Sequence, residues 1–172
     1  YNKQITMNKS LLLPILFIFL INIVSAADML KISDFSITYN SDTQRIITEG
    51  KTYGELIEPG GSIDISIELT NNFQTNNDIN DIEITATLYN ITEGEDIIEK
   101  ESRFDLNDGA VKLKELTIDI PSDAEEVQKQ LSVTVTGIDD DGVVYNVQRI
   151  VYLNIENEDH DVYIYSSRLN QT

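Results

Sequence analysis

The sequence predicts an all-β protein, an antiparallel β-sandwich of seven to eight strands preceded by an N-terminal signal peptide. Apolar and polar residues alternate with a period of two over most of the chain after residue 27, which is typical of strands that bury one face and expose the other. Turn residues separate these alternating runs, and helical spacing is nowhere sustained. Because no crossover helices join the strands, antiparallel pairing is expected.

An export signal begins the chain. Lys9 precedes an apolar run over residues 11–24, and small residues follow it. Pro14 interrupts the run, which is also shorter than the roughly 20 residues that cross a bilayer, so a permanent anchor is the poorer interpretation. We expect cleavage between Ala26 and Ala27. The mature protein is therefore expected outside the cell or on its surface.

A single domain is expected after cleavage. Cysteine is absent, so packing alone must stabilise an exported fold that cannot form disulfides. The chain divides into residues 1–6, an overextended reading frame; 7–26, the signal peptide; 27–157, the sandwich; and 158–172, a linker and the start of a further domain. The last division rests on a new alternating stretch that follows an acidic segment.

The strands follow in order along the chain. The clearest alternating runs are residues 63–69, 82–88, 116–120, 131–135 and 147–155, in which alternate residues are expected to be buried. Weaker strand candidates are residues 30–39, 45–49 and 97–104. In the first of the weaker candidates the apolar parity changes after Ile32, which indicates a bulge or a crossing between sheets. Residues 122–130 have room for one helical turn at most.

Turn chemistry supports these boundaries. Pro59 and Gly60 suit the centre of a type II turn, and Pro121 ends the preceding strand. Asp141 and Gly142 predict a hairpin between the last two strands. Strands at this spacing favour a sandwich of immunoglobulin type, with an open or closed barrel as the structural alternative.

Several segments resemble a known family. Residues 57–62 with the strand to Asn72, residues 104–106 and residues 116–121 are similar to the cell-adhesion-related domain of bacteria and archaea, abbreviated CARDB. Residues 135–142 and 158–162 resemble repeats of large S-layer-like archaeal surface proteins. The resemblance implies an immunoglobulin-like spacer, adhesion or envelope module. The chain departs from it at residues 71–80, where a longer polar loop replaces a short turn.

The charge excludes one class of function. The chain has 12 basic and 30 acidic residues and a formal charge of −18, and Lys3 and Lys9 leave with the signal peptide. Nucleic acids and anionic lipids are bound through Lys and Arg, so neither is an expected partner. Membrane contact is expected only through the signal peptide or an anchor elsewhere.

Catalysis is not expected. His160 is the single histidine of the chain and falls in an acidic linker, and no nucleophile motif completes a catalytic triad with it. Acidic pairs are too numerous in this sequence to identify a glycosidase. No cofactor is expected, apart from calcium at one loop.

That loop holds the candidate metal ligands. Asp139, Asp140 and Asp141 precede Gly142, and their oxygen atoms suit calcium, although the spacing is not that of an EF-hand and a solvated turn is the alternative. Asn90 and Asn170 each begin an Asn-x-Thr glycosylation triplet.

The expected function is that of a non-catalytic, exported structural or adhesion module of the cell surface, one repeat of a larger envelope protein. Its expected partners are other domains of the same protein, envelope components and glycans. The alternative is a carbohydrate- or calcium-binding accessory module, since tyrosines gather late in the chain, at Tyr145, Tyr152, Tyr163 and Tyr165.

Overall fold

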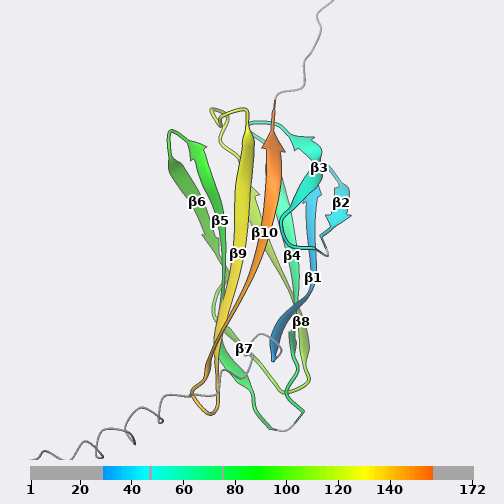
Figure 1. Ribbon diagram of the computed structural model, residues 1–172, viewed down its shortest axis with the longest axis vertical. Helices are drawn as coiled ribbons and strands as arrows, with labels where there is room; N and C mark the ends of the chain where they lie inside the picture. The colour runs from blue at the N-terminus through cyan, green and yellow to red at the C-terminus, as the bar shows by residue number, and fades with distance from the viewer. Residues whose placement is uncertain (1–28, 47, 75, 157–172) are drawn as a thin grey trace, which may run out of the picture.

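The computed structural model describes residues 29–46, 48–74 and 76–156, which form two packed β-sheets (Figure 1). Its strands are β1 (Leu30–Tyr39), β2 (Asp42–Arg45), β3 (Lys51–Ile57), β4 (Ser62–Asn71), β5 (Ile79–Thr92), β6 (Glu95–Lys100), β7 (Phe104–Leu106), β8 (Val111–Asp119), β9 (Gln128–Asp139) and β10 (Val144–Ile155). One sheet has the order β2-β1-β4-β8, and the other has the order β3-β10-β9-β5-β6, with β7 also paired to β5. The predicted all-β, two-sheet architecture is confirmed.

Two details of the prediction are wrong. The described residues form ten strands rather than seven or eight, and one pair is parallel, with Thr52 of β3 opposite Tyr152 of β10. A parallel pair needs a long connection between its strands. Here the chain between β3 and β10 passes through both sheets before it returns, so the pair forms without a crossover helix.

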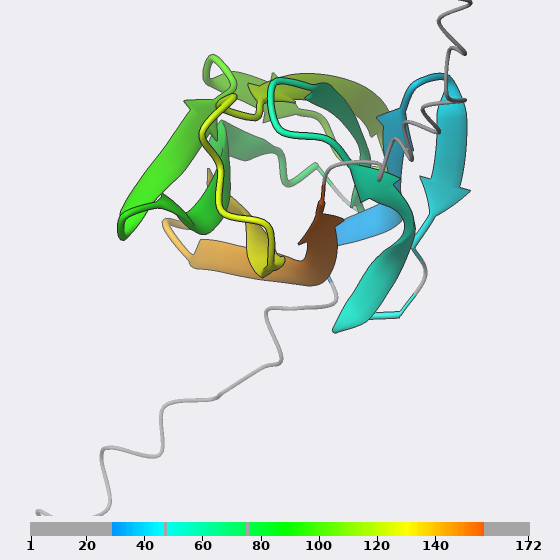
Figure 2. The same ribbon diagram turned by 90° about the horizontal axis from the view of Figure 1, so that it is seen from above.

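The core follows from the alternating pattern. On β4, Ile63, Ile65, Ile67 and Leu69 are fully buried, and alternate residues are buried in the same way along most of β5 and β9. Figure 2 shows the two sheets facing each other around this interior. Each aliphatic side chain removed from water contributes about 1.5–3 kcal/mol before the entropy of ordering is counted.

The bulge and turns predicted from the sequence are present. The register of β1 against β4 shifts between Ile32 and Asp34. Gly60 has φ +85° and the Gly61 amide donates to the Glu58 carbonyl at 3.0 Å, as a type II turn requires. Gly142, with φ +82°, closes the hairpin between β9 and β10.

Other local predictions need correction. Among the described residues of the range 45–49, only Arg45 lies in a strand, because β2 ends there and β3 begins at Lys51. Pro121 and Ala124 form a turn, closed by the Ala124 amide and the Pro121 carbonyl at 3.1 Å, and no helical turn follows. Within the described ranges the structure contains no helix long and apolar enough to cross a membrane.

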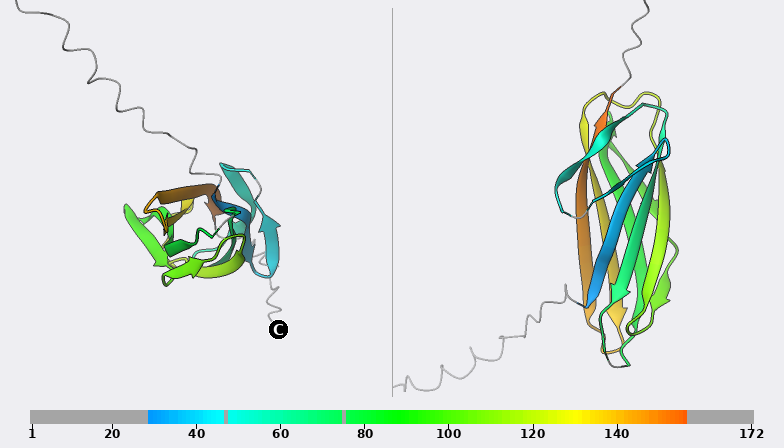
Figure 3. Two further views of the ribbon diagram at one scale, coloured as in Figure 1. Left: turned by 90° about the horizontal axis from the view of Figure 1, so that it is seen from below. Right: turned by 90° about the vertical axis from the view of Figure 1, so that its right-hand side faces the viewer.

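The described domain begins and ends at opposite ends of its long axis. Leu30, the first residue of β1, pairs with Asn71 at the end of β4. Ile155, the last residue of β10, pairs with Ile57, which precedes the start of β4 by one turn. The ten residues of β4, roughly 30 Å of extended chain, therefore separate the two ends, as Figures 1 and 3 show.

A glycine marks a close approach between β9 and β5. Gly137 occupies a core-facing position, and a Cβ placed there would lie 2.7 Å from Cγ2 of Ile79 and 3.1 Å from Cγ1 of Ile82. Asp81 between them has φ +51°, and the β5 register shifts at this point. The bulge in β5 thus presses two isoleucines into the space that a side chain on β9 would occupy.

We therefore expect Gly137→Ala to destabilise the fold by about 1–3 kcal/mol, since the added methyl group overpacks this contact. Thr136→Ala is the matched control on the outer face of the same strand, and it should cost no more than about 1 kcal/mol. Urea unfolding of both variants makes the comparison. Equal losses would contradict the close approach.

Candidate functional site

The acidic loop predicted as a calcium site is built around one buried carboxylate. Asp139 is only 5% exposed. Its Oδ1 accepts hydrogen bonds from the amides of Asp141 at 3.0 Å and Val143 at 2.8 Å. Its Oδ2 accepts from the Tyr145 hydroxyl at 2.7 Å and from Asn77 Nδ2 at 3.5 Å. The carboxylate therefore closes the hairpin from within and ties it to the loop before β5.

Asp140 holds the same loop from outside. Its carboxylate accepts hydrogen bonds from Asn80 Nδ2 at 2.8 Å and from the Asp78 amide at 3.2 Å. Its own amide donates to Asn77 Oδ1 at 3.1 Å. The three consecutive aspartates therefore do different things: Asp139 and Asp140 accept protein donors, and Asp141 contributes an amide.

This geometry bears on the calcium hypothesis. Among the residues that the structure describes, no three acidic or histidine side chains gather closely enough to hold a metal ion. Each oxygen of Asp139 accepts two hydrogen bonds, so a cation bound there would have to displace a donor. Each oxygen of Asp140 accepts one and retains a lone pair. Calcium at Asp139, Asp140 and Asp141 stays a prediction.

The hairpin perturbs both members of its buried pair. Burial acts to raise the pKa of Asp139, but the hydrogen bonds from Tyr145, Val143, Asp141 and Asn77 outweigh it and hold that pKa below its ordinary value. Burial and the bond to Asp139 raise the pKa of Tyr145 to about 12. A neutral tyrosine donating to an ionised aspartate is thus the stable form at neutral pH.

A second candidate site is a groove on the outer face of the larger sheet. It has a volume of about 370 Å³ and is lined by Tyr89, Asn90, Gln128, Lys129, Gln130 and Tyr152. The register places Tyr152 directly opposite Gln130, and Tyr89 extends the row from β5. Two partly exposed tyrosines therefore flank an amide on a flat β-surface, an arrangement able to stack and hydrogen-bond a sugar ring.

Asn90, the described one of the two predicted glycosylation sites, lies on the rim of this groove. It is exposed, has φ +52°, and falls where the pairing of β5 with β6 shifts between Leu88 and Thr92. A glycan on Asn90 and a sugar bound in the groove would compete for the same space. Glycosylation itself stays a prediction.

Lys129 supports the groove from below. Although lysine is seldom buried, its side chain is only 5% exposed, and Nζ donates to Glu125 Oε2 at 2.7 Å and to the Asn90 carbonyl. Sequence reasoning missed both Lys129 and Tyr89. The available signal was parity, since Lys129 shares the phase of the buried residues of β9 and Tyr89 that of the outward-facing residues of β5.

The remaining predicted residues are more widely separated. Tyr145 is buried in the hairpin, whereas Tyr152 lies in the groove on the outer face, so the late tyrosines do not form one cluster. Tyr163, Tyr165, His160, Asn170 and the cleavage residues Ala26 and Ala27 lie outside the described residues, as do the signal peptide and the segment 158–172.

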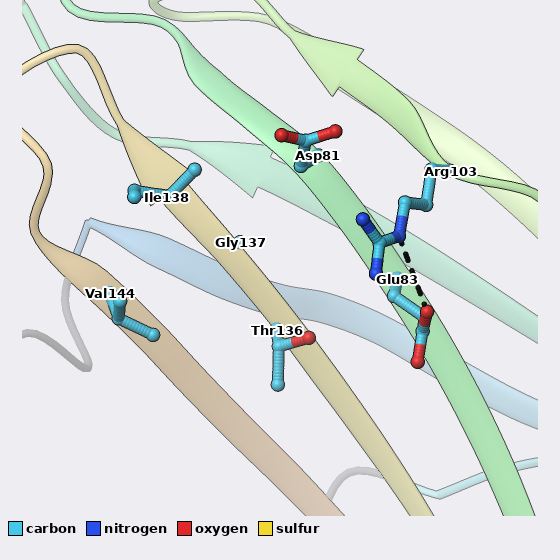
Figure 4. A pocket seen from close by; sticks show the side chains of 7 residues that line it. All are labelled: Asp81, Glu83, Arg103, Thr136, Gly137, Ile138 and Val144. Carbon is cyan, nitrogen blue, oxygen red and sulfur yellow. Dashed lines mark hydrogen bonds and ion pairs between the residues drawn. The ribbon is translucent and has the colours of Figure 1, made fainter.

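A shallow pocket of about 200 Å³ lies between β5 and β9 (Figure 4). Glu83 and Arg103 form an ion pair there, with Nε and Oε2 3.4 Å apart. Lys100 also donates to Glu83 at 3.2 Å, and these bonds, that of Lys100 foremost, lower the pKa of Glu83. The charges of Glu83, Lys100 and Arg103 therefore neutralise one another at the surface.

The hairpin yields a test with a defined pH window. Tyr145 has a raised pKa in the folded protein, so its contribution to stability is complete below pH 10, the ordinary value, and is lost as the pH rises towards 12. We expect the wild type to lose roughly 2–3 kcal/mol through this group over that window. Tyr145→Phe should lack this loss and cost about 1–2 kcal/mol at pH 7.

Urea unfolding of both proteins at intervals from pH 7 to pH 12 measures the difference. Tyr53, whose pKa is also raised by burial, is present in both and cancels. Parallel profiles for the two proteins would contradict the buried pair.

Comparison with known proteins places the fold and not the function. No protein-family model and no curated protein sequence matches this chain. The solved C-terminal domain of Wzt is similar to it, with a TM-score of 0.53 and 11% sequence identity over 83% of this chain and 84% of that domain. At that identity the likeness shows a shared β-sandwich-like fold alone.

Weaker likenesses carry no argument. A family 123 glycoside hydrolase from Clostridium perfringens matches with a TM-score of 0.48 and 13% identity, over 62% of this chain and 23% of the hydrolase. The putative ApaA protein from Bordetella pertussis matches with a TM-score of 0.44 and 12% identity, over 73% and 93% of the two chains. No family is assigned to the chain.

Proposed function

We propose that this chain is a non-catalytic module of an exported cell-surface protein, with a structural or adhesive role. The observation that carries the proposal is the placement of the domain ends: β1 begins at one end of the long axis and β10 finishes at the other. A domain joined to neighbours through such ends adds its full length to an array. The same geometry suits one repeat of a larger envelope protein.

Sequence features support the same proposal. The leader predicts export, and the resemblance to CARDB and to S-layer-like repeats favours an immunoglobulin-like module of a cell envelope. Partners would be adjacent domains of the same protein or envelope components. The net charge of −18 would limit nonspecific association on a crowded surface.

The expected location can be tested in cells that express the full chain. Antibodies against the sandwich should label intact cells, and mass spectrometry of the recovered protein should find Ala27 at its N-terminus. Ala26→Arg should block cleavage, because the position before the cut requires a small residue. Asn8→Gln, outside the apolar run, is the control. Labelling only after cell lysis would contradict the proposal.

A second candidate function is carbohydrate binding, favoured by the row of Tyr89, Gln130 and Tyr152 across the groove. The two rings lie on β5 and β10, on either side of β9. The amides beside them can form hydrogen bonds with hydroxyl groups. This role is compatible with an adhesive module, since a surface spacer that binds a glycan becomes an adhesin.

A glycan array with the purified chain tests this candidate. Tyr152→Ala or Tyr89→Ala should lower binding roughly five- to thirtyfold, because each ring is expected to provide on the order of 1–2 kcal/mol of stacking and burial. Gln148→Ala, on the same face of β10 but outside the groove, should have no effect. Absence of any bound glycan, or equal binding by all variants, would remove the candidate.

A further inference from the structure

Basic side chains occupy core-facing positions at several places along the sandwich rim. Lys112 and Lys114 on β8, Lys129 on β9 and Arg149 on β10 all share the parity of buried residues on their strands. Burying a charge is costly unless it is paired. The partners of these four side chains are therefore informative.

Three of the four have a partner. Lys129 contacts Glu125 and the Asn90 carbonyl. Lys114 donates to Glu101 Oε1 at 2.7 Å and lies 4.4 Å from the centre of the Phe104 ring. The ammonium group of Lys112 also lies over the Phe104 ring, 4.6 Å from its centre.

Arg149 is the exception. Its Nε is buried and has no hydrogen-bond partner among the residues that the structure describes. An unsatisfied buried donor costs about 1–3 kcal/mol and more when charged, and such a group calls for an unseen water, ion or ligand. The neighbouring inward residues of β10, Val147 and Val151, are apolar.

Arg149 lies in a recess between the two sheets, where both lack a covering strand. β2 covers β1 only from Ser36 to Tyr39, and β3 covers β10 only from Val151 onward. The parts of β1 before Ser36 and of β10 before Val151 therefore have no such cover, and β1 and β10 lie side by side there. This side of the sandwich faces the viewer in the right-hand view of Figure 3. The recess measures about 400 Å³, within the range of small-ligand sites.

The charges lining the recess are positive on balance. Asp34 is already engaged, because Arg45 Nε and the Phe35 amide both donate to its Oδ1. Lys31, at the exposed edge, and Arg149, within, have no carboxylate partner among the described residues. This is a local concentration of positive charge in a protein whose net charge is −18.

We propose that this recess binds a small organic carboxylate, held by the guanidinium of Arg149 and the ammonium of Lys31. The planar donors of arginine match a carboxylate in pairs. The apolar walls formed by Ile32, Phe35 and Ile46, all buried, suit the carbon skeleton of the ligand. Multiply charged anions are disfavoured, because the surrounding acidic surface repels them more strongly.

This recess is distinct from the tyrosine groove, which lies on the outer face of the larger sheet. The proposal is also independent of the cell-surface role. An alternative explanation is that Arg149 protects the free edge of β10 from pairing with another chain, as inward-pointing charges do elsewhere. That explanation predicts no ligand, so binding measurements separate the two.

Calorimetric titration of the full chain with sodium glucuronate tests the proposal, with glucose as the neutral probe and inorganic phosphate as the multiply charged one. We expect glucuronate to bind, and to bind more tightly than either. Arg149→Gln should weaken glucuronate binding at least about tenfold, and Lys31→Gln should weaken it less. Arg103→Gln, which removes the same charge outside the recess, should leave it unchanged.

Further variants keep the test independent of folding. Arg149→Lys retains the charge without the paired donors and should bind with intermediate affinity. Arg149→Leu should abolish binding while raising the melting temperature, because it replaces an unpaired buried donor with an apolar group. Equal binding of glucose, tighter binding of phosphate, no heat with glucuronate, or unchanged affinity in a folded Arg149→Gln would each overturn the proposal.

Discussion

The pairing of buried charges at the edges of the hydrophobic core is the constraint on which this sandwich depends. Aliphatic side chains fill the space between the sheets, and that space must meet water along the flanks. On β8, Lys114 lies at this boundary between core and water, where it contacts Glu101 and the ring of Phe104. On β9, Lys129 lies at the same boundary and forms an ion pair with Glu125. Long basic side chains suit these positions because their stems are apolar.

The hairpin between β9 and β10 applies the same rule with an acidic group. Asp139 faces inward, and its ionised form is favoured because four donors surround it. Since Asn77 is among them, one side chain joins the hairpin to the loop that precedes β5. The polar loop between β4 and β5 is thereby held at both ends, by Asp139 and by the buried Asn71, which donates to the carbonyls of Asn77 and Leu106.

The alternating pattern predicted the strands that cross the core, because a fully buried face leaves an unbroken period of two. It could not predict β3, where the buried Tyr53 and Ile57 are four residues apart and the register against β10 is irregular. Nor could it predict β2, whose four residues are all polar. Those strands form through pairing with distant segments, which composition does not reveal.

The candidate sites were less predictable than the fold, and Asp139 shows why. Consecutive aspartates beside a glycine indicate either a cation site or a turn held by carboxylates, and the sequence does not say whether donors are near. The deciding donors come from Asn77, Asn80 and Tyr145, two of them about sixty residues away in the chain. Asn90 was identified from a local triplet of residues. The groove beside it was not, because its two tyrosines lie on different strands, Tyr89 on β5 and Tyr152 on β10.

Arg149 is the one charged residue at the core-facing positions of β10, with apolar residues on either side, and this break in the pattern is visible in the sequence. Its significance depends on the topology, since the position is at the edge only because β3 stops short of it. The acidic exterior then gives the recess its selectivity: long-range repulsion acts on any anion, and short-range attraction acts only on a group small enough to enter. A surface that rejects polyanions can therefore still admit a single carboxylate, and the two properties arise from different parts of the same fold.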